Sequence, residues 1–261
     1  GLVYKMKVSK LPLGSPTSKG KPFINLLPLD EGETITTVMK LPECEDDCKD
    51  MSIMFATSQG NVRRNSLMDF VNVQSNGKIA MKLDEGDKLI NVRICHEDND
   101  IMLAARSGKC IRFPVTDVRV FVGRNSTGVR GIKLAEGDEV ISMSILLHSD
   151  ATSEERDEYA RIASAIKRIS AERGDDSCVS PEDTGLLNVL TTEKYKEMAE
   201  REQFILSVTS TGYGKRTSSY EYRVTGRGGQ GIANMEMSAR NKEIVSSFPI
   251  EDDNPVSYTH L

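Results

Sequence analysis

Short apolar runs separated by polar turns make up most of the hydrophobic pattern of this chain. Positions 128–141 read Gly-Val-Arg-Gly-Ile-Lys-Leu-Ala-Glu-Gly-Asp-Glu-Val-Ile, and positions 77–90 carry a close copy 51 residues upstream. Each of these copies has an apolar segment, a Glu-Gly-Asp turn and a second apolar segment, which predicts two strands joined by a tight turn. Weaker copies begin at Gly20 and Gly231, and the first of them predicts strands at 23–29 and 34–41.

A second repeated unit interleaves with the first. In each copy a Gly is followed four positions later by a basic residue. The glycines are Gly1, Gly60, Gly108 and Gly212, and the basic residues are Lys5, Arg64, Arg112 and Arg216. The last three copies follow an apolar run and a polar turn, as in a β-hairpin. Two hairpin-like units in a period near 50 residues predict an all-β repeat fold of stacked blades, because one such unit cannot bury its apolar face alone.

The repeat is interrupted between positions 147 and 203. A capped helix is predicted to begin at Ser153 and run to about position 173, followed by a polar loop and a second amphipathic helix at 192–203. The strand pattern resumes in step at Phe204, so we expect an insertion within one domain spanning residues 1–254. The simpler interpretation is a helical insertion in a blade loop, and the alternative is an arm that binds a partner or regulates the domain.

Both ends of the chain break the repeat. The chain opens at the Gly of a repeat, which leads us to expect a preceding piece, and residues 255–261 stop the pattern where another apolar strand is due. We expect this last segment to be a truncation or a non-native tail.

Composition and charge narrow the class of protein. Hydrophobic residues make up 38% and charged residues 28%, as in ordinary cytoplasmic globular proteins, and no signal peptide or long apolar run is present. The five Cys are odd in number, which favours reduced thiols. Cys44 and Cys48 have a spacing that some metal sites use, but without a second pair of ligands no metal is predicted. The chain has a net charge of −5, and the negative charge is concentrated in the insertion, which contains 14 acidic residues and 8 Lys or Arg.

No catalytic arrangement is predicted. His96, His148 and His260 are not near a candidate nucleophile motif, and no Walker loop is present. Tyr213, Tyr220 and Tyr222 are expected to pack in the fold. The run Gly-Arg-Gly-Gly-Gln-Gly at 226–231 satisfies G-x-G-x-x-G, but a strand pattern follows where a dinucleotide site needs a helix. It is predicted to be a blade turn or a loop that approaches DNA phosphate closely.

Basic residues at matching turn positions are the positive signal for function. Equivalent positions on successive blades would lie along one edge, and a regular edge of positive charge can follow a phosphate backbone. The pattern alone leaves DNA or RNA binding and a protein-interaction propeller both open. The candidate DNA contacts are Lys5, Lys19, Lys21, Arg63, Arg64, Lys78, Arg112, Arg124, Arg130, Lys215, Arg216 and Arg227, with Arg223 beside them.

Three segments in different repeats resemble the C-terminal domain of the DNA gyrase A subunit. They are Lys-Pro-Phe-Ile-Asn-Leu-Leu-Pro-Leu at 21–29, Asn-Ser-Thr-Gly-Val-Arg-Gly-Ile-Lys-Leu at 125–134 and Gly-Tyr-Gly-Lys-Arg-Thr at 212–217. The helical insertion resembles that of alphaproteobacterial members. The resemblance implies a β-pinwheel, a propeller-like ring of four-stranded blades, with about four of the usual six blades in this chain.

The same resemblance implies a function and partners. We expect the domain to wrap double-stranded DNA around its basic edge, within an A2B2 holoenzyme that contains the gyrase B subunit together with a second A subunit. That type IIA topoisomerase uses ATP and Mg, bound outside this chain by the B subunit, to introduce negative supercoils, and it works on the nucleoid in the cytoplasm. No cofactor and no catalytic residue is expected in this chain itself.

Two departures limit this transfer. The Gln-Arg-Arg-Gly-Gly-Lys-Gly box, which the family needs for wrapping, is absent, and the similar run at 225–231 has Gln230 where Lys is expected. The DNA-cleaving domain with its catalytic Tyr is also absent. We therefore expect the chain to bind DNA but wrap it poorly. The alternatives are the C-terminal domain of the topoisomerase IV A subunit, or a propeller-like protein-interaction module.

Overall fold

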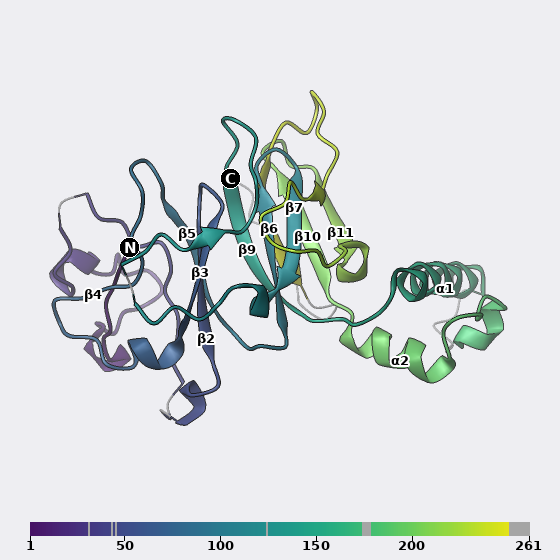
Figure 1. Cartoon of the computed structure of the whole chain (residues 1–261), viewed down its shortest axis with the longest axis horizontal. Coiled ribbons are helices and arrows are strands. Elements are labelled where there is room, and N and C mark those ends of the chain that lie inside the picture. The colour runs from purple at the N-terminus through teal and green to yellow at the C-terminus, as the bar shows by residue number, and fades with distance from the viewer. Residues whose placement is uncertain (31, 43, 45, 124, 174–178, 251–261) are drawn as a thin grey trace.

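Two four-stranded antiparallel sheets form the centre of the molecule (Figure 1). The computed structural model describes residues 1–30, 32–42, 44, 46–123, 125–173 and 179–250. The first sheet, here the β2 blade, has the order β5-β2-β3-β8 and contains β2 (Ser52–Thr57), β3 (Asn61–Ser66), β5 (Leu89–Cys95) and β8 (Val129–Arg130). The second, the β6 blade, has the order β12-β7-β6-β9 and contains β6 (Asn99–Ala105), β7 (Lys109–Pro114), β9 (Val140–Leu147) and β12 (Ile232–Ala233).

Two smaller sheets lie on either side of this pair. The β10 blade has the order β11-β10-β13 and contains β10 (Phe204–Thr209), β11 (Gly214–Ser218) and β13 (Ile244–Ile250). Near the N-terminus, β1 (Leu2–Val3) pairs with β4 (Lys78–Ile79). Strand β9 lies beside both β5 and β13, so successive blades contact one another through these strands. The all-β, propeller-like fold expected from the repeat is confirmed.

Each four-stranded blade takes its outer strand from the next repeat. Strand β8 pairs with β3, and β12 pairs with β7, through two residues on each side. The positive-φ turn glycines Gly60 and Gly108 fix this exchange, because each carbonyl accepts two N–H groups from the incoming segment. The donors to Gly60 are Gly131 and Ile132, and the donors to Gly108 are Asn234 and Met235. The two repeated units of the sequence are therefore hydrogen-bonded to each other in space.

The largest apolar core lies between the β2 and β6 blades. It contains fully buried side chains from both, including Met54, Leu103, Phe113 and Met143. Ile132, which follows the exchanged strand β8, closes the same core. Burial raises the pKa of the Cys95 thiol, also in this core, to about 12. Together with its burial, this makes Cys95 a packing residue.

The strands expected at 23–29 and 34–41 are absent. A single 3₁₀ turn, η2 (Phe23–Asn25), occupies the first, and residues 33–42 have no regular structure. In the two blades the segments equivalent to 35–41 are β5 and β9, which pair with the upstream strands β2 and β6. None of the described strands pairs with residues 35–41. Ile24 in the first segment is 60% exposed and Val38 in the second is 75% exposed, whereas Met39 and Leu41 pack partly against the apolar cluster of the β2 blade.

The helices predicted for the insertion are confirmed. Helix α1 spans Ser153–Arg173, a turn η6 spans Pro181–Thr184, and α2 spans Thr192–Arg201, two residues shorter than expected. Helix α1 begins at Ser153 as predicted, and Thr152 and Glu155 form its capping box: each side chain accepts the other's backbone N–H. We call residues 148–203 the helical arm; it extends to one side of the sheets (Figure 1).

The helical arm is packed against the β10 blade. Tyr220, in the turn η7 (Ser219–Glu221) after β11, meets the edge of the Tyr159 ring with 5.2 Å between centroids. The Tyr220 hydroxyl donates to the Met198 carbonyl at 2.8 Å. Tyr220 and Tyr222 are buried as expected, whereas Tyr213 is 54% exposed, so the prediction that it packs was wrong. The proposed tail at 255–261 and the end of the predicted domain lie outside the described residues. No helix in the described parts of the chain is long and apolar enough to cross a membrane.

Candidate nucleic-acid interface

The arginines that recur in register have a structural role in the two complete blades. Arg64 pairs with Met54 across its hairpin, and Arg112 pairs with Met102 at the equivalent position. Arg64 is only 4% exposed, and its Nε donates to Ser52 Oγ at 2.9 Å while its Nη2 donates to Glu97 at 2.7 Å. These bonds hold the guanidinium against its own blade, away from solvent.

Arg112 is anchored still more completely. Its Nε donates to Asp100 Oδ2 at 2.8 Å, its Nη1 to the Ser219 carbonyl at 2.7 Å and its Nη2 to the Leu147 carbonyl at 2.8 Å. Arg63, which is fully buried, donates from Nη1 to the Ser126 carbonyl and lies 4.9 Å from the Phe121 ring centroid. The expectation that Arg63, Arg64 and Arg112 lie on an exposed edge was therefore wrong.

The other candidates lie at or near the surface. Arg130, Arg216 and Arg227 are exposed, as is Lys215. The Arg216 guanidinium lies over the Phe204 ring, 4.4 Å from its centroid. This contact takes the place of the hydrogen bonds that Arg64 and Arg112 make within their blades. The N-terminal candidates are dispersed: Lys19 and Lys21 are in irregular chain, Lys5 donates to the Val71 carbonyl, and the half-buried Lys78 donates to the Asp69 carbonyl. Arg124 lies outside the described residues.

Exposed basic residues gather where strand β8 meets the glycine-rich loop at 226–231. Arg227 Nη1 donates to the Arg130 carbonyl at 3.1 Å, and its Nε donates to the Asp117 carbonyl at 3.0 Å. Backbone bonds join the same segments, from Gly228 to the Gly131 carbonyl and from Lys133 to the Gly229 carbonyl. We call this group the outer-edge cluster. Its members are Arg119, Arg130, Lys133, Arg223 and Arg227, all exposed.

Two members of the cluster were not among the sequence candidates. Arg119 stacks on the Phe121 ring at 4.5 Å, in the segment that follows Asp117. Lys133 extends from the chain just beyond β8. A signal for Lys133 was present, since Lys82 occupies the matching position one repeat earlier. A signal for Arg119 was also present, since Val118-Arg119-Val120 matches Tyr222-Arg223-Val224 two periods later. The structure makes these segments equivalent, because Val120 bridges to Arg64 and Val224 bridges to Arg112.

The glycine-rich loop is a blade turn. Strand β12 follows it directly, and Gly231 has a φ of 73°, where an added Cβ would collide with the Cys110 carbonyl. Arg223, Gly226, Gly229 and Gln230 help to line a pocket of about 180 Å³ beside β7. That volume is below the roughly 300 Å³ of the smallest usual ligand pockets, so the loop does not form a dinucleotide site. Its exposed backbone can still approach an extended anion.

Metal binding has no support in the described residues. No three His, Cys, Asp or Glu side chains gather there in a way that could hold an ion. Cys48 Sγ instead points at the Cys44 carbonyl, at 3.8 Å.

Four-stranded antiparallel blades that exchange their outer strands and stack side by side define a propeller-type repeat domain. Comparison with known families gives the particular one. The chain belongs to the family described as DNA gyrase C-terminal domain, beta-propeller, whose model matches residues 1–42, 52–96, 99–146 and 203–250. The unmatched residues between 146 and 203 coincide with the helical arm.

Curated relatives agree with this assignment. The chain is 49% identical over 253 residues to the DNA gyrase A subunit of Rickettsia bellii, covering 97% of this chain and 27% of that protein. It is 49% identical to the same protein of Granulibacter bethesdensis, covering 98% and 28%, and 31% identical to that of Escherichia coli, covering 97% and 22%. The chain thus spans about a quarter of the length of these relatives.

Solved structures support the fold. The C-terminal domain of DNA topoisomerase IV matches with a TM-score of 0.62 at 18% identity, covering 89% of this chain and 55% of that one. The E. coli ParC C-terminal domain matches with a TM-score of 0.56 at 13% identity, covering 95% and 76%. At these identities the matches concern architecture alone.

Proposed function

We propose that this domain binds duplex DNA through its outer-edge cluster, by contacts to phosphates without reading bases. The observation that carries the proposal is the bonding between Arg227 and the backbone of Arg130 and Asp117. Those bonds hold the exposed Arg227 guanidinium against the backbone of Arg130, on a segment from another repeat, and the Arg130 side chain is itself exposed. Exposed guanidinium groups from neighbouring segments suit phosphate oxygens, which accept charge-assisted hydrogen bonds.

The loop beside the pair favours the same ligand. Gly226 and Gly229 have no side chains to keep a duplex at a distance, and both are exposed. Phosphate contacts of this kind fix the position of DNA without selecting its sequence. Lys215 and Arg216 on the neighbouring β10 blade offer a further point of contact.

In the intact protein, we propose that these contacts wrap DNA for the type IIA topoisomerase. Bending a duplex by 40 to 90° over one site costs roughly 1–6 kcal/mol, so contacts must be spread over several blades before DNA follows the surface. Such a wrap would present a neighbouring segment in a fixed crossing sense, so that ATP-driven strand passage introduces negative supercoils. The setting is the cytoplasmic A2B2 assembly with the gyrase B subunit, which binds ATP and Mg.

A salt titration tests the DNA contacts. Arg130→Gln with Arg227→Gln should weaken binding of a labelled duplex equally for two unrelated sequences. The slope of log K against log salt should become shallower by about 0.9 for each phosphate contact that the substitutions remove. Arg168→Gln, an exposed change of equal charge on helix α1, is the matched control and should leave the slope unchanged.

The outcomes separate the alternatives. A double variant with the wild-type slope would place the DNA path elsewhere on the domain. No duplex binding at low salt would favour the protein-interaction module. In the full-length enzyme, charge reversal of Arg130, Lys133 and Arg227 should abolish supercoiling while leaving cleavage and relaxation intact, and parallel loss of all three activities would contradict the wrapping role.

A further inference from the structure

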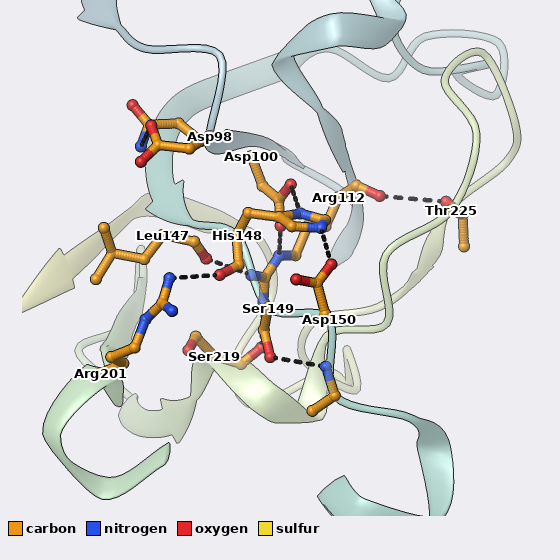
Figure 2. Close-up of polar contacts among 12 residues, drawn as sticks. Asp98, Asp100, Arg112, Leu147, His148, Ser149, Asp150, Arg201, Ser219 and Thr225 are labelled. Carbon is orange, nitrogen blue, oxygen red and sulfur yellow. Dashed lines mark hydrogen bonds and ion pairs between the residues drawn. The ribbon is translucent and has the colours of Figure 1, made fainter. Parts of the chain in front are cut away.

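A polar cluster at the base of the helical arm has no part in the proposed DNA interface (Figure 2). The Asp100 carboxylate is fully buried, and its Oδ2 accepts from Arg112 Nε at 2.8 Å. Its Oδ1 lies 2.7 Å from His148 Nδ1. The other imidazole nitrogen, Nε2, lies 3.0 Å from the Oδ1 of the exposed Asp150. His148 thus joins a buried carboxylate of strand β6 to a carboxylate at the start of the arm.

The β2 and β10 blades do not have this carboxylate. Asp100 lies two residues before Met102, and the equivalent positions before Met54 and Leu206 are Ser52 and Phe204. In all three blades the residue at this position contacts the recurring arginine, as hydroxyl, carboxylate or aromatic ring. A carboxylate is therefore not required by the blade itself. It occurs where the strand next to it, β9, continues into the helical arm.

We propose that His148 is a proton-controlled latch that holds the first residues of the helical arm against the β6 blade. A protonated imidazole donates from both nitrogens and can bond Asp100 and Asp150 together. A neutral imidazole has one donor, so keeping the bond to Asp100 turns the Nε2 lone pair toward the Asp150 carboxylate. The contact between His148 Nε2 and the Asp150 carboxylate is then repulsive. Residues 148–152 lose that attachment to the β6 blade and open.

The direction of the pH response follows from the same contacts. The hydrogen bond to Asp100 is the main cause that raises the pKa of His148, with desolvation opposing it and the charges of Asp100 and Asp150 adding to it. A raised pKa means that protons bind the closed latch more tightly than the open one. The stabilisation is complete below the ordinary His pKa near 6.5, and it is lost as pH rises through the higher value of the closed state.

Charged and polar groups from four other elements and from the turn before β6 face this site. Arg112 of β7 shares the Asp100 carboxylate, and Arg201 of α2 donates to the His148 carbonyl at 3.1 Å. Arg156 of α1 and Tyr220 of η7 act on Arg112 electrostatically. From the turn before β6, Asp98 accepts the His148 backbone N–H through its carbonyl. Only His148 among these groups has an ordinary pKa near neutrality, so we assign the response to it.

Other contacts keep the rest of the arm in place when the latch opens. Tyr220 packs in the arm core, and Gln203 Oε1 accepts the Leu147 N–H at 2.7 Å. Opening should therefore be confined to residues 148–152 and the adjoining capping box of α1, while the α1 and α2 packing persists.

Two measurements test the latch. An NMR titration should give His148 a pKa above the ordinary His value near 6.5, and Asp150→Asn should lower it. Amide hydrogen exchange, corrected for the intrinsic pH dependence, should rise at residues 148–156 as pH passes through that pKa. The equilibrium constant for opening should be tenfold larger with neutral His148 than with cationic His148 for each unit by which closing raises the His148 pKa. Asp98→Asn, a change of equal charge in the adjacent turn, is the control and should leave both readouts unchanged.

A neutral substitute completes the test. His148→Gln should show the high exchange of the deprotonated state at every pH, with protection in the α1 and α2 cores retained. The proposal is overturned if His148 titrates at or below the ordinary His value near 6.5, or if exchange at 148–156 is independent of pH in the wild-type domain. Neither readout involves DNA, so the outcome is separate from that of the salt titration.

Discussion

A guanidinium group can join chain segments in a folded repeat as readily as it can contact phosphate. Arg112 contacts strand β6, the end of β9 and the turn η7 at once. Its planar donors point in fixed directions, which suits acceptors that come from separate elements. At 3% exposure it connects the β6 blade, the arm base and the β10 blade.

Removing Arg112 alone should be costly, because it leaves the buried Asp100 carboxylate without its main partner. We expect Arg112→Met to lower the free energy of unfolding by about 3–5 kcal/mol, measured by urea denaturation. Adding Asp100→Leu should restore much of that loss, since no buried charge remains. The exposed change Arg130→Gln is the control and should stay within about 0.5 kcal/mol of wild type. A single variant as stable as this control would contradict the structural role.

Gly128 and Gly137 allow the cost of a positive φ to be measured separately from the cost of a steric clash. Gly128 has a φ of 88° and an added Cβ would collide with the Val62 carbonyl, whereas Gly137 has a φ of 78° and open space around it. Gly137→Ala should cost about 1 kcal/mol from strain, and Gly128→Ala clearly more, because β8 must also move away from β3. Equal losses in thermal or urea unfolding would mean that β8 adjusts freely.

The sequence predicted part of the candidate site and could not predict the rest. Arg130 and Arg227 were identified from the sequence and lie together. Arg64 and Arg112 were wrongly assigned to the same edge, because an arginine that recurs at matching repeat positions gives the same sequence pattern whether the row is exposed or buried. Successive side chains of a strand point to opposite faces of the sheet, so one of two consecutive residues, such as Arg63 and Arg64, would normally face solvent. Here both are buried, because other chain segments cover both faces of strand β3.

Among the elements, local signals predicted helices better than strands. The caps and apolar spacing that indicate the arm's helices lie within each helical segment. A strand exists only if another strand offers its edge, which is why residues 34–41 have a strand-like sequence and no strand. Exchange of outer strands between repeats was likewise not visible in the sequence, since β8 and β12 contribute only two residues each.

Glu158 gives the helical arm its own pH dependence. It is fully buried on α1 and accepts the N–H groups of residues 188–190 at 2.8–3.0 Å. Burial alone would raise the pKa of this carboxyl, but the three N–H donors outweigh it and the pKa is lowered. The stabilisation is thus present above the ordinary Glu pKa and lost as pH falls through the lower value of the folded arm.

Glu158→Gln should loosen the arm at neutral pH and remove this acid transition. Helical circular dichroism and exchange at residues 186–192 should report it, with Glu154→Gln in the exposed first turn as the control. An arm that loses structure in acid identically with and without Glu158 would place the transition in other groups.

At the scale of the whole molecule, the helical arm is an addition to a continuous set of blades. Its two ends meet, because the Leu147 N–H donates to Gln203 at 2.7 Å. The family model resumes at residue 203 after the arm. Apart from the base of the arm, its contacts with the sheets include the cover over Tyr220 and Lys167 of α1, which lies 5.7 Å from the Phe204 ring centroid.

Replacing residues 149–202 with a short Gly-Ser linker, together with Tyr220→Ser, should remove the helical signal and keep the strand signal. Duplex affinity should stay near that of the intact domain, because the outer-edge cluster lies outside the arm. Far-UV circular dichroism and the same salt titration provide the measurements. Loss of the strand signal would show that the arm is part of the blade core.

The exchange of outer strands delays completion of each blade while the chain is being made on the ribosome. Strand β3 ends at Ser66 and its partner β8 begins at Val129, so about 63 residues must be made before that edge is covered. At roughly 5–20 residues per second this takes about 3–13 s. The arm lengthens the interval for the next blade, because β7 ends at Pro114 and β12 begins at Ile232, a delay of roughly 6–24 s. During that time β7 presents an unpaired edge to other nascent chains, and a ribosome pause within the arm would prolong the period in which misassembly competes with completion of the blade.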